Sequence, residues 1–386
     1  MTHRMFPRWI LTALLALVMV ALAGCGGQAP ASAWPGLTPG DGVVYLTVTA
    51  KAFAINVADG SKKWEYEHKI PQTSLFGSSS VPDKMHATPA LGNGLVYFGT
   101  DGGYLFALDV TTGAEKWRYL PNQTATFIPF IKEQSAPVYA GPAVAGKRVI
   151  FAGTADKIYA VDAVTGKPDW QFIAGGRVWA TPLVVSDTAY ISTLNHKLIA
   201  INLATGKERW TFDQAKGALA GAPVFDNGVV YAGSFDNHLY AVDAASGEKR
   251  WAFNASNWVW EGPAVVSGTL YFGDVGGNVY ALDAATQQLV WAQPFQAGGP
   301  VRATPLYADG VLYVGTANGA LYALDAATGK ERWAQPFKVP NAQFLTTPVL
   351  QGGLLLVAPL GTPTQLYGLN PANGQTQWQF PIPTNK

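Results

Sequence analysis

Short apolar runs separated by polar turns recur along most of this 386-residue chain. In the clearest copy, residues 311–314 and 321–324 are β-branched or aromatic runs bounded by Gly and Asn, a pattern typical of two strands joined by a hairpin. Asp325, Thr328-Gly329 and Trp333 follow the second run. Gly tolerates the positive φ of a tight turn, and an Asp carboxylate can accept backbone N–H bonds there. The pattern therefore predicts a second tight turn that leads into a Trp-bearing strand.

The unit occurs eight times along the chain. The intervals between successive tryptophans are 53, 53, 40, 41, 40, 42 and 45 residues, and self-similarity near 40 residues indicates a stacked or circular array. One turn departs from the pattern, because Gln287 stands where the other copies have Gly, so we expect that turn to be strained or of another type. The repeated tryptophans are Trp64, Trp117, Trp170, Trp210, Trp251, Trp291, Trp333 and Trp378.

Each unit supplies an inner strand ending near a proline, two hairpin strands and an outer strand with the Trp, which together predict a four-stranded antiparallel sheet. Radial repetition of such sheets predicts an all-β, eight-bladed β-propeller. An open solenoid would need polar capping repeats, and the last copy resembles the others. A Trp buries about 150–250 Å², so we expect these eight to pack between blades and not against a ligand. The inner strand of the first blade should come from residues 34–40 or from elsewhere in the chain.

The N-terminal 24 residues combine Arg4 and Arg8 with an apolar run over residues 9–20, as a secretory signal does. The following Leu22-Ala23-Gly24-Cys25 resembles a bacterial lipoprotein signal, which implies cleavage before Cys25 and lipid attachment to it; a plain signal peptide is the alternative. We therefore expect a signal over 1–24, a lipidated Cys25 and short tether over 25–40, and the propeller over 41–386. Cys25 is the single cysteine, so the mature monomer can form no disulfide.

Composition narrows the class of protein further. Charged residues are 13% of the chain, against about 25% in a typical soluble protein, while 42 Gly, 26 Pro and 12% aromatic residues suit a turn-rich all-β fold. The net charge is +1 and the basic residues are scattered, which argues against nucleic-acid binding.

The unit Ala-x-Asp/Asn-x-x-Thr-Gly-x-x-x-Trp resembles the tryptophan-docking repeat of the pyrroloquinoline-quinone-like (PQQ-like) propellers. The resemblance implies one of two functions. Quinoprotein dehydrogenases of this family bind PQQ and Ca²⁺ on the propeller axis, whereas shorter lipoproteins, similar to the scaffold of the outer-membrane β-barrel assembly machinery, bind partner proteins and no cofactor. The dehydrogenases are generally longer and typically carry a disulfide between adjacent cysteines, and their haem-bearing relatives have a Cys-x-x-Cys-His motif. This chain lacks both motifs, so the resemblance favours a non-catalytic protein without a cofactor.

Residues three positions before each repeat proline should surround the mouth of the central channel, and residues five positions before it should lie nearer the rim. They differ from copy to copy, unlike the Trp and Asp positions. They can simply fill and hydrate the channel, or they can form a recognition surface, because Trp and Arg are enriched at binding hot spots. The candidate partner-binding residues are His86, Tyr139, Arg177, Trp179, Trp258, Trp260 and Arg302.

Two longer excursions, 65–85 and 120–136, should join the same face, and the apolar cluster at 127–130 is either a lid or a docking patch. The short Asp-, Asn- and Gly-rich loops suit hairpin turns better than a Ca²⁺ site of six to eight oxygens. His196 and His238 fall at matching positions of adjacent copies but make only half a zinc site. The sequence thus predicts no metal site and no catalytic triad.

We therefore expect a scaffold outside the cytoplasm, anchored through the lipid on Cys25 to the bacterial cell membrane or to the periplasmic face of the outer membrane. Its partner would be an envelope protein or an exposed polypeptide, bound by a monomer or by a subunit of a hetero-complex. The alternatives are a PQQ-dependent dehydrogenase that uses Ca²⁺ and a sensor that binds a cofactor or a polysaccharide.

Overall fold

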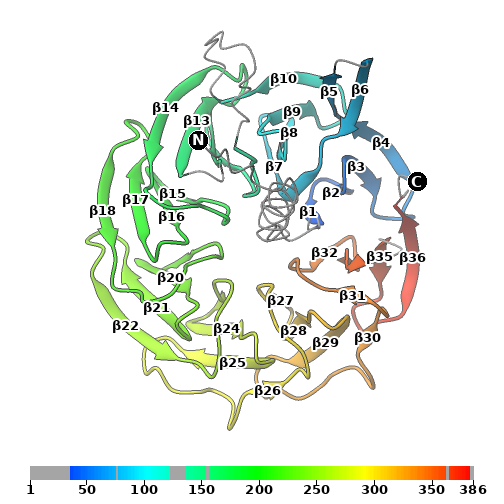
Figure 1. The fold of residues 1–386 in the computed structure, drawn as a ribbon. Coiled ribbons are helices and arrows are strands. Elements are labelled where there is room, and N and C mark those ends of the chain that lie inside the picture. The colour runs from blue at the N-terminus through cyan, green and yellow to red at the C-terminus, as the bar shows by residue number, and fades with distance from the viewer. Residues whose placement is uncertain (1–34, 75–76, 122–135, 154–155, 362–364, 383–386) are drawn as a thin grey trace, which may run out of the picture. The chain divides into compact units, whose positions relative to one another are not determined.

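The computed structural model describes residues 35–386, apart from 75–76, 122–135, 154–155, 362–364 and 383–386. Cys25, the signal and the apolar cluster at 127–130 lie outside the described residues. Residues 33–386 form one compact unit, whose described part is built of strands and turns (Figure 1). No helix long and apolar enough to span a membrane occurs among the described residues.

Eight four-stranded antiparallel sheets follow one another around a ring, each built from consecutive strands (Figure 1). Blades 1 to 4 are β1 (Gly36–Pro39), β2 (Val43–Val48), β3 (Lys51–Asn56), β4 (Lys62–Glu67); β7 (Met85–Gly92), β8 (Leu95–Thr100), β9 (Leu105–Asp109), β10 (Glu115–Tyr119); β11 (Ala143–Ala145), β12 (Arg148–Ala152), β13 (Lys157–Asp162), β14 (Pro168–Ile173); and β15 (Leu183–Val185), β16 (Thr188–Ser192), β17 (Leu198–Asn202), β18 (Glu208–Phe212). Blades 5 to 8 are β19 (Val224–Asp226), β20 (Val229–Gly233), β21 (His238–Asp243), β22 (Lys249–Asn254); β23 (Ala264–Val266), β24 (Thr269–Gly273), β25 (Asn278–Asp283), β26 (Phe295–Gln296); β27 (Leu306–Ala308), β28 (Val311–Gly315), β29 (Ala320–Asp325), β30 (Phe337–Lys338); and β32 (Val349–Gln351), β33 (Leu354–Val357), β35 (Gln365–Leu369), β36 (Thr376–Pro381). Two further ribbons pair β5 (Lys69–Ser74) with β6 (Gly77–Pro82) and β31 (Ala342–Gln343) with β34 (Leu360–Gly361). The all-β, eight-bladed prediction is confirmed.

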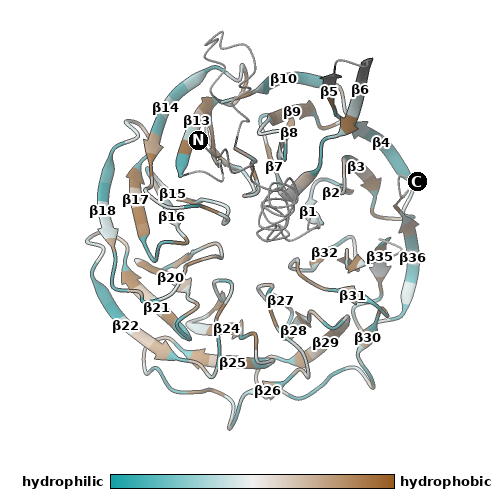
Figure 2. Ribbon diagram, in the orientation of Figure 1, coloured by the Kyte–Doolittle hydropathy of each residue, from teal (hydrophilic) through white to brown (hydrophobic). Residues whose placement is uncertain are grey.

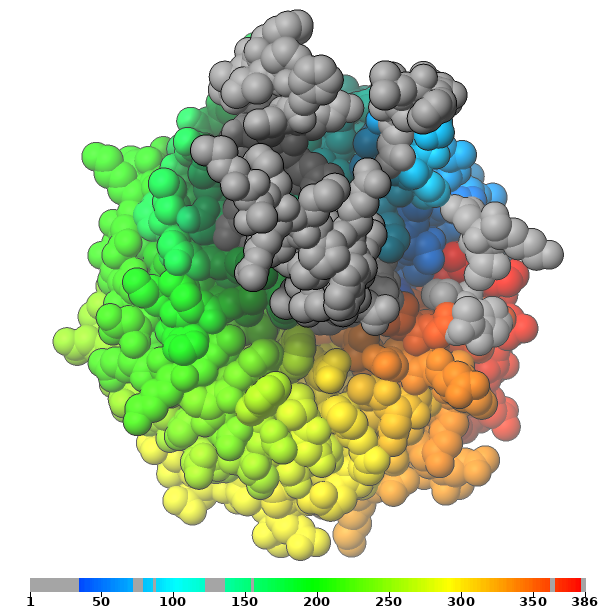
Figure 3. Space-filling model, viewed as in Figure 1, coloured from blue at the N-terminus to red at the C-terminus, as the bar shows by residue number. Residues whose placement is uncertain are grey.

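The core lies between blades. Each of the eight apolar clusters joins two consecutive blades, and one of them joins the last blade to the first through Leu356 and Phe53. Apolar residues concentrate on the middle strands and polar residues on the outer ones (Figure 2), as expected when each sheet buries both faces against its neighbours. Figure 3 shows the blades packed side by side around the ring.

The ring closes without exchange of strands between its two ends. The first blade contains only N-terminal strands and the last only C-terminal strands. Side chains of the last blade cross the junction instead, where Thr346 Oγ1 donates to Pro35 O and Gln351 Nε2 donates to Gly40 O. The inner strand of blade 1 is β1, within the expected stretch. In blades 3 to 8 the inner strand begins just after the repeat proline and does not end there, which corrects the predicted order within the unit.

The repeat tryptophans link each blade to the next. Seven indole N–H groups donate to a backbone carbonyl of the following blade at 2.9–3.1 Å: Trp64, Trp117, Trp170, Trp210, Trp291, Trp333 and Trp378. Each of these indoles also lies against the turn glycine of that blade, so closely that a Cβ on the glycine would stand 2.6–2.9 Å from a ring atom. A glycine is thus needed both for its positive φ, as at Gly247 (78°), and for its missing side chain.

The turn without glycine lies opposite Trp251, the repeat tryptophan that is not among these seven. Gln287 has a φ of 60°, and its turn keeps the usual bonds, because Asp283 Oδ1 accepts the N–H groups of Ala285 and Thr286 at 3.0 and 2.7 Å. The turn is therefore of the common type in a strained form. Trp251 still packs on the cluster that includes Ala284, but no hydrogen bond from its indole to that blade is seen within the described residues.

The first long excursion is not a loop. Residues 69–82 form the ribbon β5–β6, whose base is held by Asp83. Its carboxylate accepts the N–H of Gly102 at 2.7 Å and lies 2.9 Å from His68 Nδ1. The buried Asp83 thus ties the ribbon to the β8–β9 loop of blade 2. The second excursion falls mostly within residues 122–135, outside the described part.

Candidate functional site at the mouth of the ring

The chain approaches each blade through a segment of five residues before the repeat proline, which we call the approach segment. In blade 6, Val259 N donates to Ser234 O of blade 5 at 3.1 Å, and Trp258 O accepts Val275 N of blade 6 at 2.9 Å. The segment is therefore held between the middle loops of two blades. Val259 is fully buried, and because side chains of extended backbone alternate, the residues on either side of it point the other way. This alternation explains why Trp258 and Trp260, the fifth and third residues before the proline of blade 6, are more accessible than Val259.

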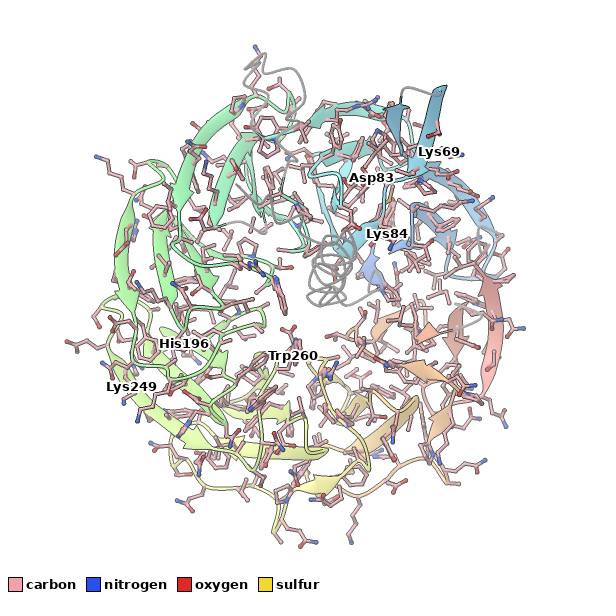
Figure 4. All side chains as sticks on the ribbon, in the orientation of Figure 1. Lys69, Asp83, Lys84, His196, Lys249 and Trp260 are labelled. Atoms are coloured by element: carbon pink, nitrogen blue, oxygen red, sulfur yellow. The ribbon has the colours of Figure 1, made fainter. Side chains whose placement is uncertain are left out.

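A stacked set of side chains, the mouth stack, lies on the approach segments of blades 6 and 7. The ring of Trp258 stacks on Phe235 at 4.9 Å with an interplanar angle of 11°, and Phe235 contacts Trp260 at 4.8 Å. The Arg302 guanidinium carbon lies 4.9 Å from the centroid of Trp260. Trp260 lies on the inner side of the ring, whereas Lys249 lies at the outer rim (Figure 4). The structure thus brings together three predicted residues and adds Phe235 from the β20–β21 loop.

Trp258 and Arg302 are unusual within this stack. The Trp258 side chain is 46% exposed although it is large and apolar. Arg302 Nε is buried and makes no hydrogen bond with the described residues. A buried donor without a partner costs about 1–3 kcal/mol. The stack therefore combines exposed aromatic surface with an unmet donor, a combination that a ligand would relieve.

Glu261 lies directly beside the stack, at a position where other blades have Ala, Gly or Thr. Its Oε2 accepts the N–H of Ala222 in blade 5 at 2.8 Å, and a Cβ on Gly221 would stand 2.7 Å from that oxygen. The residue keeps some exposed surface, yet protein surrounds its carboxyl on nearly every side. This burial raises its pKa to about 7, and the bond from Ala222 only partly offsets the effect. The sequence analysis missed both Glu261 and Phe235.

The other predicted residues lie on equivalent segments. Arg177 is exposed and Trp179 half-buried on the approach segment of blade 4. Tyr139 is half-buried before blade 3, where burial and, to a smaller extent, the charge of Asp101 raise its pKa. His86 belongs to β7, and its side chain is outside the described part. Their role in partner binding stays a prediction.

The short loops use their carboxylates for turn structure. Asp274 is buried and bonds to Asn278 and Tyr280 at 2.8 Å each. The described residues contain no group of three His, Cys, Asp or Glu side chains that could hold a metal ion. The alignment of His196 with His238 was wrong, because Leu198 and Leu239 occupy equivalent register positions and His196 therefore matches Asn237.

Blades 6 and 7 differ from the others at the rim. In blade 5, Phe253 follows Trp251 by two residues and pairs with Leu239, whereas in blade 7 Phe337 follows Trp333 by four and pairs with the equivalent Leu321. Two extra residues between the Trp and the Phe therefore bulge out of the outer strand of blade 7. Blade 6 has the same Trp-Ala-Gln-Pro-Phe sequence and the same pairing, because Phe295 pairs with Val279. Next to the blade 7 bulge lies an open groove of about 370 Å³, lined by Gln335, Pro336, Phe337, Lys338, Asn373, Gly374 and Gln375.

A family model described as outer membrane protein assembly factor BamB matches residues 123–252 and 235–386. This chain belongs to that PQQ-like propeller family. A second model, the β-propeller domain of glucose, ethanol and alcohol dehydrogenases, matches residues 54–180.

Among curated proteins, the chain is 31% identical over 159 residues to the dehydrogenase subunit of the quinone alcohol dehydrogenase of Gluconacetobacter polyoxogenes, covering 39% of this chain and 21% of that protein. It is also 31% identical over 147 residues to the serine/threonine-protein kinase AfsK of Streptomyces griseus, covering 38% of this chain and 16% of the kinase. The chain thus spans about a fifth of these relatives.

Two solved structures share the fold. BamB from Moraxella catarrhalis has a TM-score of 0.66 at 18% identity, with 89% of this chain and 96% of that one covered. The quinohemoprotein alcohol dehydrogenase of Comamonas testosteroni has a TM-score of 0.67 at 17% identity, with 89% and 74% covered.

Proposed function

We propose that this PQQ-like propeller is a non-catalytic scaffold that binds a partner polypeptide at the mouth of its ring. In this proposal the chain works outside the cytoplasm, held at the envelope by a lipid on Cys25. The observation that carries the proposal is the mouth stack, because an exposed Trp stacked on Phe beside an arginine has the composition of a binding hot spot. The match to the BamB family model supports a role in envelope or outer-membrane protein assembly.

A crosslinking experiment tests the proposal. The full-length chain, produced in its own host, is crosslinked in intact cells, and the attached protein is identified. Trp258→Ala and Trp260→Ala should abolish that crosslink while the thermal unfolding of the protein stays unchanged. Ile173→Ala is the matched control, because Ile173 is an exposed apolar side chain (64%) at the rim of blade 3. A partner retained by both mouth variants would contradict the proposal.

The quinone-dependent dehydrogenase remains the second candidate because of the 31% identity to the alcohol dehydrogenase subunit. The described residues at the position of Glu261 and its equivalents do not fit a PQQ–Ca²⁺ site. Calcium takes six to eight oxygen ligands, usually several carboxylates, yet at the position of Glu261 the other blades carry small or hydroxyl side chains. Dye-linked alcohol oxidation by the chain after addition of PQQ and Ca²⁺ would support the dehydrogenase and refute the scaffold.

A further inference from the structure

The arginines of this protein divide into two groups by their ion pairs. Arg118, Arg148, Arg209, Arg250 and Arg332 each pair with a carboxylate of the same blade, at 2.5–2.8 Å. Arg177 and Arg302, the other two arginines in the described part, make no ion pair with described residues. Both lie on approach segments at the mouth of the ring. Five arginines thus have a carboxylate partner within their own blade, and the two at the mouth have none among the described residues.

The described carboxylates near the mouth form no ion pair with these two arginines, because their oxygens bond to other groups. Asp236 accepts the N–H of Lys216 at 2.6 Å and the Tyr240 hydroxyl at 2.7 Å. Asp274 is buried in a similar set of bonds. The carboxyl of Glu261, nearest to the stack, is disfavoured as an anion by its burial. Arg177 and Arg302 therefore present guanidinium groups at the mouth that have no carboxylate partner among the described residues.

From this arrangement we infer that the mouth binds an extended polypeptide segment that is acidic, with an apolar side chain on the mouth stack and a carboxylate on Arg302. This inference rests on the proposed scaffold function and names the chemistry of the partner. Guanidinium groups bind carboxylates through paired hydrogen bonds, and a carboxylate would supply the acceptor that Arg302 Nε lacks. Arg177 belongs to blade 4 and Arg302 to blade 7, so a ligand that used both would have to be long. The stack between them offers Trp258 and Trp260 to its apolar residues.

Labelled synthetic peptides test the inference on the full-length protein by fluorescence anisotropy. Three peptides share the same Leu and Phe positions and carry Asp/Glu, Asn/Gln or Lys at the rest. The acidic peptide should bind most tightly, and added salt should weaken it because exposed charges are screened. Arg302→Gln should reduce its affinity on the order of tenfold or more, and Arg302→Lys should restore part of the loss. Arg250→Gln, which removes an arginine paired with Asp243 at the rim, should leave binding unchanged.

The possible results separate this inference from the scaffold proposal. Equal binding of the acidic and amide peptides, or no effect of Arg302→Gln, would overturn the acidic partner. If the cellular crosslink depends on Trp260 while no acidic peptide binds, the inference fails and the scaffold stands. If an acidic oligosaccharide binds through Arg302 and the peptides do not, the ligand is a polysaccharide and both proposals fall.

Discussion

The strained turn of blade 6 leads to a prediction about the stability of the protein, for which the equivalent glycine turns of the other blades are the reference. Gln287→Gly should stabilise the protein, because Gln287 holds a φ of 60° at a position where seven blades use Gly. The left-handed conformation costs a non-glycine residue about 1–2 kcal/mol, which the substitution removes. Against this gain, Gly loses more conformational freedom on folding, which costs about 0.5–1 kcal/mol. Removing the side chain also opens the place that the other indoles occupy, so Trp251 could gain a hydrogen bond worth about 0.5–1.5 kcal/mol.

These terms give a net gain of about 1–2 kcal/mol for Gln287→Gly. Urea denaturation followed by tryptophan fluorescence measures it as a higher midpoint with an unchanged slope. A variant that unfolds at the same or a lower urea concentration would refute the reasoning.

A matched pair of glycines separates backbone strain from contact with the indole. Gly247 and Gly268 have similar φ angles of 78° and 81°, but a Cβ would stand 2.6 Å from Trp210 at Gly247 and would meet nothing within 4 Å at Gly268. Gly268→Ala should therefore cost about 1 kcal/mol. Gly247→Ala should cost clearly more, because the indole of Trp210 must shift. Equal losses would show that the contact with Trp210 contributes nothing to the requirement for glycine.

Three further predictions concern buried charge, the turns and the rim. Because burial raises the folded-state pKa of Glu261 to about 7 from an ordinary 4.5, its favourable contribution is complete below pH 4.5 and is lost as the pH rises through 7. Glu261→Gln should thus flatten the stability profile across that window and gain up to about 3 kcal/mol at pH 8; melting curves at pH 5 and 8 that change in parallel with wild type would contradict this. Hydrogen bonds, first from Arg250, lower the pKa of Asp243 to about 2, so its contribution is present above pH 3.8 and is lost as the pH falls through 2. Asp243→Asn should keep the turn, as Asn202 does in blade 4, cost under about 1 kcal/mol at pH 7, and make acid unfolding less steep; a large loss at pH 7 would argue against the equivalence. Deleting Gln335 and Pro336 should let the outer strand of blade 7 pair as in blade 5, which amide exchange would report as stronger protection of residues 333–338; unchanged or weaker protection would refute the two-residue bulge.

The repeat made the ring predictable because its signals are local. A Trp, an Asp and a turn Gly at fixed spacing define one blade, and eight copies define how many blades pack together. The strained turn could be predicted from Gln287 alone, because the requirement for Gly in that turn is also local. The two-residue bulges were also present in the sequence, since the last two Trp intervals are 42 and 45 residues and the three before them are 40 or 41.

Contacts between copies could not be predicted in the same way. Phe235 reaches Trp258 and Trp260 because the approach segment of one blade passes the loop of the blade before it. The ribbon at 69–82 escaped notice because its strands are largely polar and lack the alternation that marks a half-buried strand. Its anchor, Asp83, lies beside Gly102 only in the fold.

The departures from the repeat that carry the candidate site are shared between two neighbouring blades. Glu261 of blade 6 fits because blade 5 has Gly221 opposite it, where any Cβ would stand 2.7 Å from the carboxylate oxygen. Trp258 and Trp260 of blade 6 likewise rest on Phe235 of blade 5. A single irregular residue in a repeat protein can merely lower the stability of the fold. Gln287 is such a residue, because the adjacent blade has no matching change that accommodates it. Residues that are irregular in both blades and complementary to each other form a built surface, and this complementarity is the physical reason why we propose partner binding at the junction of blades 5 and 6.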